Sequence, residues 1–271
     1  MHHAAAPPQP PVPIASGHSP TPVEVVAPTA RRPLLLCCDH ASHHVPPALG
    51  QLGLPPEELT RHIGWDIGAA AVAQGLSRRL KATAVLSGVS RLVIDCNRPL
   101  GHPTSICAES DGTLVPGNQA LSAEDRAGRA AWYHPYHAAL AGQLDRLEQA
   151  GGVAALIAIH SFTPHMGGNA RPWHVGVLWN RDPRLAVPLI EALRRRGDLV
   201  VGDNEPYSGR LANHTVDTHG GAQGRPHVSI EIRQDLLAAA AGIGRWVALL
   251  AELLPPILAR PELASRAEPF K

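Results

Sequence analysis

The sequence predicts an α/β fold, a three-layer sandwich in which a mixed, mostly parallel sheet is flanked by helices. Two short apolar runs, residues 34–38 and 153–159, are typical of strands that are buried on both faces of a sheet. Segments with apolar side chains at helical spacing lie between such runs, for example residues 69–81. This alternation of strands and helices indicates helices packed on the faces of a parallel sheet.

The chain has 271 residues, which is long enough for one large domain. We expect this domain at residues 23–260, because no linker-like stretch interrupts them. The first 28 residues are rich in proline, which has no backbone N–H group, and they offer little apolar area to bury. This composition predicts a flexible tail. The domain boundaries therefore leave an amino-terminal tail at residues 1–22 and a carboxyl-terminal tail at residues 261–271.

The charges nearly cancel, with 24 basic and 23 acidic residues, which argues against nucleic acid or an anionic membrane as partner. A small molecule is the expected partner, bound by a monomer or small homo-oligomer. No basic segment followed by an apolar one marks a signal peptide, and no run approaches 18 apolar residues, so we expect a cytoplasmic protein. The four cysteines contain no CxxC pair and are expected to be buried, reduced thiols.

The first half of the predicted domain starts with the strand at 34–38, which ends where Pro46 and Pro47 prevent regular continuation. A helix is expected to start near 55–59, where prolines precede acids. The helix at 69–81 ends on basic residues, which suit the negative end of its dipole. Short apolar runs predict further strands at 83–86 and 90–99.

In the second half, Ser122 and Asp125 form a capping box after a polar loop, and they predict a helix to about residue 150 that Pro135 could interrupt. Apolar segments predict strands at 174–179 and 199–201, separated by a helix that Asp182 caps. Alternating polarity at 227–233 predicts a strand with His227, Ser229, Glu231 and Arg233 on one face. A last apolar helix, from about 235 to 254, is expected to end before Pro255.

Histidines follow two of the buried strands. Asp39 and His40 follow the strand at 34–38, and His160 follows the strand at 153–159. Polar residues at the carboxyl ends of such strands lie beside the crevice where α/β proteins bind ligands. Asp66 would lie at the amino end of the helix at 69–81. Two imidazoles and a carboxylate are a donor set that a hydrolytic zinc site uses, and Glu231 can supply its base.

Seven segments together resemble the N-formylglutamate amidohydrolase family, in order and over nearly all of residues 22–254. They are Cys38-Asp39-His40-Ala41-Ser42, Gly64-Trp65-Asp66-Ile67-Gly68-Ala69, Ser90-Arg91-Leu92-Val93-Ile94-Asp95-Cys96-Asn97-Arg98, His160-Ser161-Phe162-Thr163-Pro164, Arg171-Pro172-Trp173, Asn204-Glu205-Pro206-Tyr207 and Ile230-Glu231-Ile232-Arg233-Gln234-Asp235-Leu236. The resemblance implies a fold similar to zinc carboxypeptidases and aspartoacylases, of the phosphorylase/hydrolase-like type. It implies hydrolysis of N-formyl-L-glutamate to formate and glutamate.

The same resemblance assigns roles to residues. His40, Asp66 and His160 match the ligands of one Zn²⁺ ion, or of another divalent metal, and Glu231 matches the general base. The run from Asp95 to Arg98 is similar to the aspartoacylase segment that holds the substrate carboxylate. Because a substrate with two carboxylates requires guanidinium groups, we expect substrate contacts from Asn97, Arg98, Arg171 and Arg233. Asp39 could orient a ligand imidazole or cap a turn.

Several alternatives stay open. His43 is a rival to Asp66 for the third metal ligand, because the second ligand of the carboxypeptidase pattern lies three residues after the first histidine. Arg98 could instead form a structural ion pair with Asp95 or Asp66. A zinc amidase that cleaves a peptide or cell-wall amide is a second enzyme hypothesis, and a non-catalytic relative that binds a metal or ligand is a third.

Overall fold

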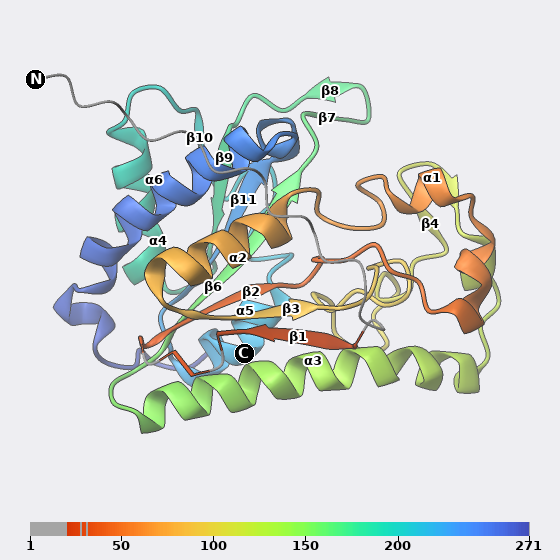
Figure 1. Ribbon diagram of the computed structural model, residues 1–271, viewed down its shortest axis with the longest axis horizontal. Helices are drawn as coiled ribbons and strands as arrows, with labels where there is room; N and C mark the ends of the chain where they lie inside the picture. Colours follow the sequence, from red (N-terminus) through yellow and green to blue (C-terminus); the bar gives the residue numbers. More distant parts are fainter. Residues whose placement is uncertain (1–20, 28, 31, 271) are drawn as a thin grey trace, which may run out of the picture.

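A seven-stranded mixed sheet forms the centre of the computed structural model, which describes residues 21–27, 29–30 and 32–270 (Figure 1). In spatial order, the strands are β1 (Val23–Val26), β3 (Thr83–Ser87), β2 (Leu34–Cys38), β6 (Ala155–Phe162), β11 (His227–Arg233), β9 (Val175–Leu178) and β10 (Val201–Asp203). The strands β2, β3, β6 and β11 are mutually parallel, as are β9 and β10, whereas β1 runs antiparallel to β3 and β9 runs antiparallel to β11.

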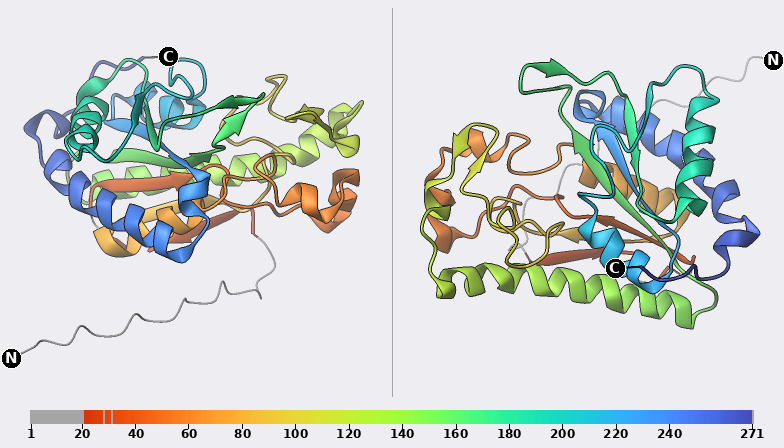
Figure 2. Two further views of the ribbon diagram at one scale, coloured as in Figure 1. Left: turned by 90° about the horizontal axis from the view of Figure 1, so that it is seen from above. Right: turned by 180° about the vertical axis from the view of Figure 1, so that it is seen from behind.

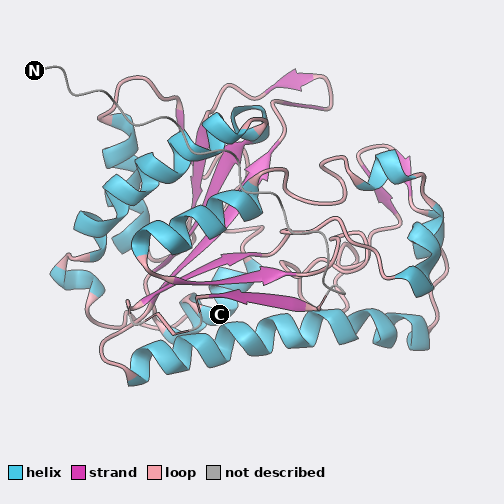
Figure 3. Cartoon of the chain, viewed as in Figure 1, coloured by secondary structure: helices cyan, strands magenta, loops and turns pink. Residues whose placement is uncertain are grey.

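Helices cover both faces of this sheet, so the predicted three-layer α/β sandwich is confirmed (Figures 1 and 2). One layer contains α2 (Ala69–Leu80), α4 (Pro183–Arg194) and α6 (Ala240–Leu258). The other contains the long α3 (Ala123–Gln149) and the short α5 (His214–His219). The four-residue α1 (Pro56–Leu59) lies at one end of the molecule, among the loops that Figure 3 colours pink.

Alternation along β2 explains how its five apolar residues fill two cores. Leu34, Leu36 and Cys38 belong to the core beneath α2, α4 and α6, whereas Leu35 and Cys37 belong to the core beneath α3. Successive side chains of a strand point to opposite faces, so a strand between two helical layers must be apolar throughout. All five residues are buried, and Cys37, Cys38 and Cys96 are buried free thiols, while Cys107 is half-buried.

The predicted strand at residues 90–99 is wrong. These residues form a series of buried turns, in which the amide groups of Val93 and Ile94 donate to the Ser90 carbonyl oxygen. Leu92, Val93 and Ile94 all lie in the core beneath α3. A short apolar run that is buried on all sides has the same composition in a turn as in a strand, so its periodicity cannot separate the two.

Other boundaries also differ from those predicted. The proline-rich start is largely outside the described residues, but Val23–Val26 form the edge strand β1, so the predicted flexible tail does not extend to residue 28. Helix α3 passes through Pro135 without a break, and α6 continues through Pro255 and Pro256 to Leu258. In the segment after residue 260, backbone amides of Ala267 and Phe270 donate to the carbonyl oxygens of Gly224 and Gly221, so this segment is packed on the domain.

Helix α6 is, by length and composition alone, apolar enough to cross a membrane, which the sequence analysis did not expect of any segment. The helix nevertheless carries Arg245 and Glu252, and its buried residues Trp246, Leu250 and Leu254 belong to the core beneath α2 and α4. One face of the helix therefore packs against the domain. Two small hairpins complete the structure: β4 (Glu109–Ser110) with β5 (Thr113–Leu114), and β7 (His165–Met166) with β8 (Asn169–Ala170).

Candidate active site

The predicted residues His40, His160 and Asp66 lie together at the carboxyl ends of the central strands. His40 follows β2 by two residues, and His160 belongs to the end of β6, which is the neighbour of β2. Asp66 precedes α2, and its backbone amide donates to the His40 carbonyl oxygen at 2.9 Å, which joins the start of that helix to the end of β2. All three side chains are buried.

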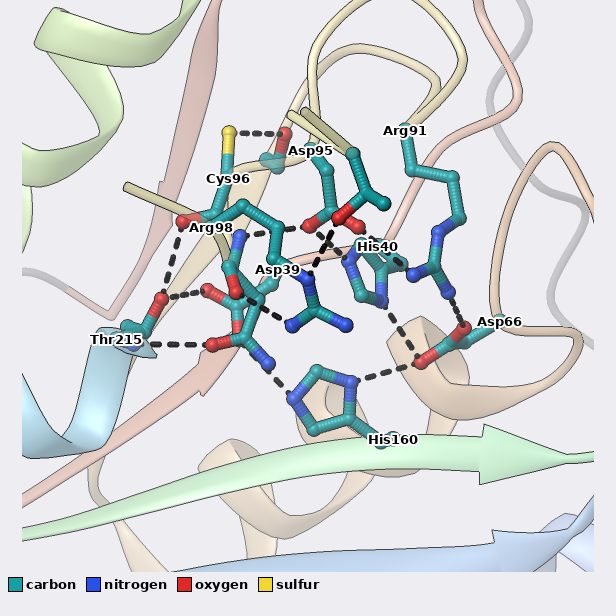
Figure 4. A network of polar contacts seen from close by, with 12 residues as sticks. Asp39, His40, Asp66, Arg91, Asp95, Cys96, Arg98, His160 and Thr215 are labelled. Atoms are coloured by element: carbon teal, nitrogen blue, oxygen red, sulfur yellow. Dashed lines mark hydrogen bonds and ion pairs between the residues drawn. The ribbon is translucent and has the colours of Figure 1, made fainter. Parts of the chain in front are cut away.

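One oxygen of Asp66 faces both imidazoles (Figure 4). Asp66 Oδ2 lies 3.2 Å from His40 Nδ1 and 2.8 Å from His160 Nδ1. The donor atoms of the three residues lie within 4.8 Å of one another. No other group of three or more histidine, cysteine or acidic side chains in the described part of the chain comes together in this way.

Two further carboxylates lie behind the imidazoles. Asp95 Oδ1 is 2.8 Å from His40 Nε2, and Asp39 Oδ2 is at ion-pair distance, 3.0 Å, from His160 Nε2. Each imidazole is therefore flanked by a carboxylate on both of its nitrogens. Carboxylates in this position orient metal-binding histidines by holding a proton on the distal nitrogen, which leaves the other nitrogen free to bind a metal.

The electrostatics of this group favour a bound cation. Burial alone would lower the pKa of His160, but Asp39 and Asp66 outweigh it and raise this pKa well above its ordinary value. The pKa of His40 is likewise raised, because Asp95 and Asp66 outweigh burial and the charge of Arg91. The surrounding carboxylates thus favour a positive charge at both imidazoles. A divalent cation between the Nδ1 atoms and Asp66 Oδ2 would supply positive charge there, so these donors fit such an ion.

Glu231 lies on β11 directly beside His160, with which it pairs in the parallel register of β11 and β6. Its side chain is buried and lines the cavity above the site, and its Oε2 atom has no hydrogen-bond partner. Burial raises the pKa of Glu231 to about 7, against the charges of His160 and His40, which lower it. A carboxylate with a pKa near neutrality can accept and return a proton near pH 7.

A cavity of about 280 Å³ opens above these residues. Asn97 and Arg98, the predicted substrate contacts, line it, and so does Arg91, which was not among the predicted site residues. Arg91 Nη2 lies 2.7 Å from Asp95 Oδ2, and its Nη1 lies 3.6 Å from Asp66 Oδ1. Arg98 forms no ion pair with a described carboxylate, since these carboxylates pair with Arg91 and the histidines, although the charge of Arg98 helps to lower the pKa of Asp95.

The other predicted residues lie outside the cavity wall. Arg171 stacks on Tyr207 and donates to its hydroxyl group at 2.9 Å, and Arg233 pairs with Asp235 at 2.8 Å. Neither guanidinium lines the cavity. His43, the rival third ligand, packs edge-on against the indole of Trp65, with ring centroids 5.0 Å apart, and is not in the group around Asp66.

Sequence reasoning also missed Tyr136 and Thr215, which fix the position of Asp39. The hydroxyl groups of Tyr136, on α3, and Thr215, on α5, donate to Asp39 Oδ1 at 2.9 and 2.6 Å. The backbone amide of Thr215 donates to Asn97 Oδ1 at 2.9 Å, so α5 links the two sides of the site. A lone threonine or tyrosine carries no local signal of this role, because these contacts span 97 and 176 residues of sequence.

Comparisons with known proteins show the family and the fold of the chain. The family model described as N-formylglutamate amidohydrolase matches residues 32–238. The structure of gene product Atu2144 from Agrobacterium tumefaciens is 36% identical in sequence with a TM-score of 0.84, over 88% of this chain and 94% of that one. The N-formylglutamate amidohydrolase from Ralstonia eutropha JMP134 is 21% identical with a TM-score of 0.64, over 87% and 96%, and shares the fold. No curated protein matches the chain.

Proposed function

We propose that this chain, which belongs to the N-formylglutamate amidohydrolase family and is therefore a hydrolase of amide bonds, cleaves N-formyl-L-glutamate or a similar N-acyl amino acid. The reaction would require one divalent metal ion, for which Zn²⁺ is the first candidate. The products are the free acid, formate for a formyl substrate, and the amino acid. The observation that supports this proposal best is the convergence of two Nδ1 atoms and a carboxylate oxygen beside an unpartnered, buried glutamate.

In this proposal, His40, His160 and Asp66 would hold the ion, with the two Nδ1 atoms and Asp66 Oδ2 as the available donors. Asp95 and Asp39 orient the two imidazoles from behind. A bound divalent cation supplies Lewis acidity, which lowers the pKa of water and polarises an amide carbonyl group. His43 is not among these ligands, because its ring lies against Trp65.

Glu231 moves the proton. Its carboxylate accepts a proton from the attacking water as the new C–O bond forms at the acyl carbon. It then returns that proton to the amine nitrogen as the C–N bond breaks, so that water is consumed and a neutral leaving group departs. Arg98 binds the carboxylate of the substrate, since its guanidinium lines the cavity without a carboxylate partner among the described residues.

The test combines metal analysis of the purified protein with assays of acid release from formyl, acetyl and succinyl derivatives of Glu, Asp and Gln. We expect Glu231→Gln to keep its metal and lose about 10²- to 10⁴-fold in kcat, the usual contribution of a general acid–base. Glu252→Gln, on the exposed side of α6, is the matched control and should behave as the wild type. Normal turnover by Glu231→Gln contradicts the mechanism, and a wild-type protein that binds metal without any turnover would favour a non-catalytic relative.

The predicted cytoplasmic location, the small-molecule partner and the monomeric or small homo-oligomeric state accompany this proposal. Family membership supports a small-molecule substrate. The location and the oligomeric state stay predictions, which cell fractionation and light scattering of the purified protein would test.

A further inference from the structure

The charges that line the cavity determine which substrate it can accept. N-formylglutamate has two carboxylates, and carboxylates in buried sites are bound by guanidinium groups. The sequence suggested three such groups, at Arg98, Arg171 and Arg233. In the structure, the guanidinium groups that line the cavity are those of Arg91 and Arg98.

Arg91 is not available to a second carboxylate. Its Nη2 atom is bonded to Asp95 at 2.7 Å and its Nη1 atom lies 3.6 Å from Asp66. The two acids raise the pKa of Arg91 above its ordinary value despite burial, so this guanidinium stays charged and is compensated within the protein. Its positive charge balances the negative charges of Asp95 and Asp66, which contact the histidines.

Arg98 differs from Arg91 in this respect. Its Nε atom donates to the Thr104 hydroxyl group at 3.2 Å and its Nη1 atom donates to the Asn97 carbonyl oxygen at 2.9 Å, so both partners are neutral. Within residues 21–27, 29–30 and 32–270, it is the one cavity-lining guanidinium that forms no ion pair. One guanidinium fork binds one carboxylate group.

The remaining guanidinium groups are turned to other partners. Arg171 lies behind the wall, where it donates to Tyr207, Thr163 and the sulfur of Met166, all three of which line the cavity. Arg233 contacts Asp235 and the backbone carbonyl oxygens of residues 171–173. A second carboxylate in the cavity would therefore contact Tyr207, Thr163 and Met166, which lie between the cavity and Arg171.

Apart from His62 and the two histidines of the candidate metal site, the rest of the wall holds no further cationic side chain among the described residues, and it combines hydroxyl groups, such as those of Ser110, Thr163 and Tyr207, with apolar and acidic side chains. Ile63, Phe162, Met166 and Ala212 contribute apolar surface. Asp111, from the β4–β5 hairpin, adds a carboxylate at the wall and is paired with His62 at 3.1 Å and with Arg61 at 3.7 Å. Since Arg61 and His62 are already paired with Asp111, they are not free to bind a second carboxylate, and the charge of Asp111 adds a repulsion that its 38% exposure to solvent weakens.

Resting on the proposed function, we infer that the preferred substrate is an N-acyl amino acid with a single carboxylate, bound by Arg98, and an uncharged side chain, rather than N-formylglutamate. The number of carboxylates follows from the one cavity-lining guanidinium that forms no ion pair with a described residue. The rest of the wall and Asp111 disfavour a negative charge at the side chain. Amino acids with amide or apolar side chains, such as glutamine, methionine and leucine, fit this description.

The decisive comparison uses N-formyl-L-glutamine and N-formyl-L-glutamate, which have nearly the same size and differ in one charge. With the zinc-loaded wild-type protein, we expect kcat/KM to be about tenfold or more higher for the glutamine derivative, because burying a carboxylate without a partner is strongly unfavourable. N-formyl-L-leucine should also be cleaved faster than N-formyl-L-glutamate. A preference for glutamate overturns this inference and leaves the proposed function intact, whereas no turnover of any derivative overturns the proposed function.

Binding gives a second, independent measurement. The zinc-loaded Glu231→Gln variant should bind N-formyl-L-glutamine more tightly than N-formyl-L-glutamate in isothermal titration calorimetry, with about the same tenfold ratio, because charge exclusion acts on binding. Equal or reversed affinities overturn the inference even where no turnover is seen.

Two variants identify the residues responsible. Asp111→Asn removes the acidic wall and should improve kcat/KM for the glutamate derivative selectively, while Asp198→Asn, an exposed acid paired with Arg196, should leave both values unchanged. Arg171→Met should leave the ratio of the two substrates unaltered. A glutamate preference in the wild type that Arg171→Met abolishes would show that Arg171 reaches a second carboxylate, which is the opposite of the inference.

Discussion

Replacing Asp95 by asparagine should weaken metal binding although Asp95 is not itself a proposed ligand. Its two oxygens accept three N–H groups: Oδ1 accepts from His40 Nε2 and the Asn97 amide, both at 2.8 Å, and Oδ2 accepts from Arg91 at 2.7 Å. An amide has one oxygen and one NH₂ group. In either orientation of the side chain, the NH₂ group of the variant faces an N–H donor.

The expected magnitude follows from that mismatch. If the amide oxygen occupies the Oδ1 position, where it accepts from His40 and Asn97, the imidazole loses the negative charge of its acceptor; if the amide nitrogen occupies that position, the imidazole loses the acceptor altogether. Loss of such a partner usually lowers metal affinity by about 10- to 100-fold, which corresponds to about 1.4 to 2.7 kcal/mol. Asp95 is 4% exposed, so water cannot easily replace the lost contact.

The assay is competition for Zn²⁺ between the protein and a chromophoric chelator of known affinity. Asp182→Asn is the matched control, because Asp182 is also a buried acid but caps α4 and pairs with Arg184, and this variant should keep the wild-type zinc affinity. Zinc binding by Asp95→Asn within about twofold of the wild type would refute the orienting role, since the expected loss is at least about tenfold.

Two further predictions concern the ligand set and the pH dependence of stability. Asp66→Asn should abolish stoichiometric zinc binding, whereas His43→Ala should retain it because His43 packs on Trp65. Metal analysis of both purified variants tests this prediction. Loss of zinc in His43→Ala but not in Asp66→Asn would show that His43 is the third ligand. Burial lowers the pKa of His219 from 6.5 to about 4, so the unfolded chain binds a proton there that the folded chain does not, and stability should fall as the pH drops from 6.5 towards 4. The free energy of unfolding, measured with urea, should fall by an amount on the order of 3 kcal/mol between pH 6.5 and pH 4. His219→Gln should reduce this fall, whereas the control His165→Gln, at an exposed position, should not. The same dependence of the unfolding free energy on pH in His219→Gln and the wild type would contradict the assignment.

Sequence reasoning predicted the parts of the site that follow regular strands. A continuous apolar run can be recognised without knowledge of the fold, and the residue after it lies at the edge of the sheet, so His40 and His160 could be placed near each other in advance. Glu231 could be placed on the polar face of its strand for the same reason. These predictions depended on local periodicity, which the sheet preserved.

The supporting residues could not be predicted in this way. Arg91 and Asp95 lie on the buried turns at residues 90–99, for which the apolar run predicted a strand. The directions of their side chains depend on those turns. Arg171 and Arg233 were selected by residue type, because a guanidinium is suited to bind a carboxylate. Residue type says nothing about where a long side chain points, and both arginines found partners inside the protein.

The positions of Asp39 and Asp95 connect the chemistry of the site to the packing of the α3 layer. Asp39 is held by Tyr136 of α3 and Thr215 of α5, and α5 is itself joined to α3 by the pairs Tyr133–His214 and His137–His219, each at 2.9 Å. Asp95 is fixed by the turns that pack beneath the same helix. Both carboxylates contact the imidazoles from the side opposite Asp66, so the affinity for a metal depends on the position of α3. Substitutions that shift α3 should therefore change the metal affinity through Asp39 and Asp95, although they lie far from the proposed ligands.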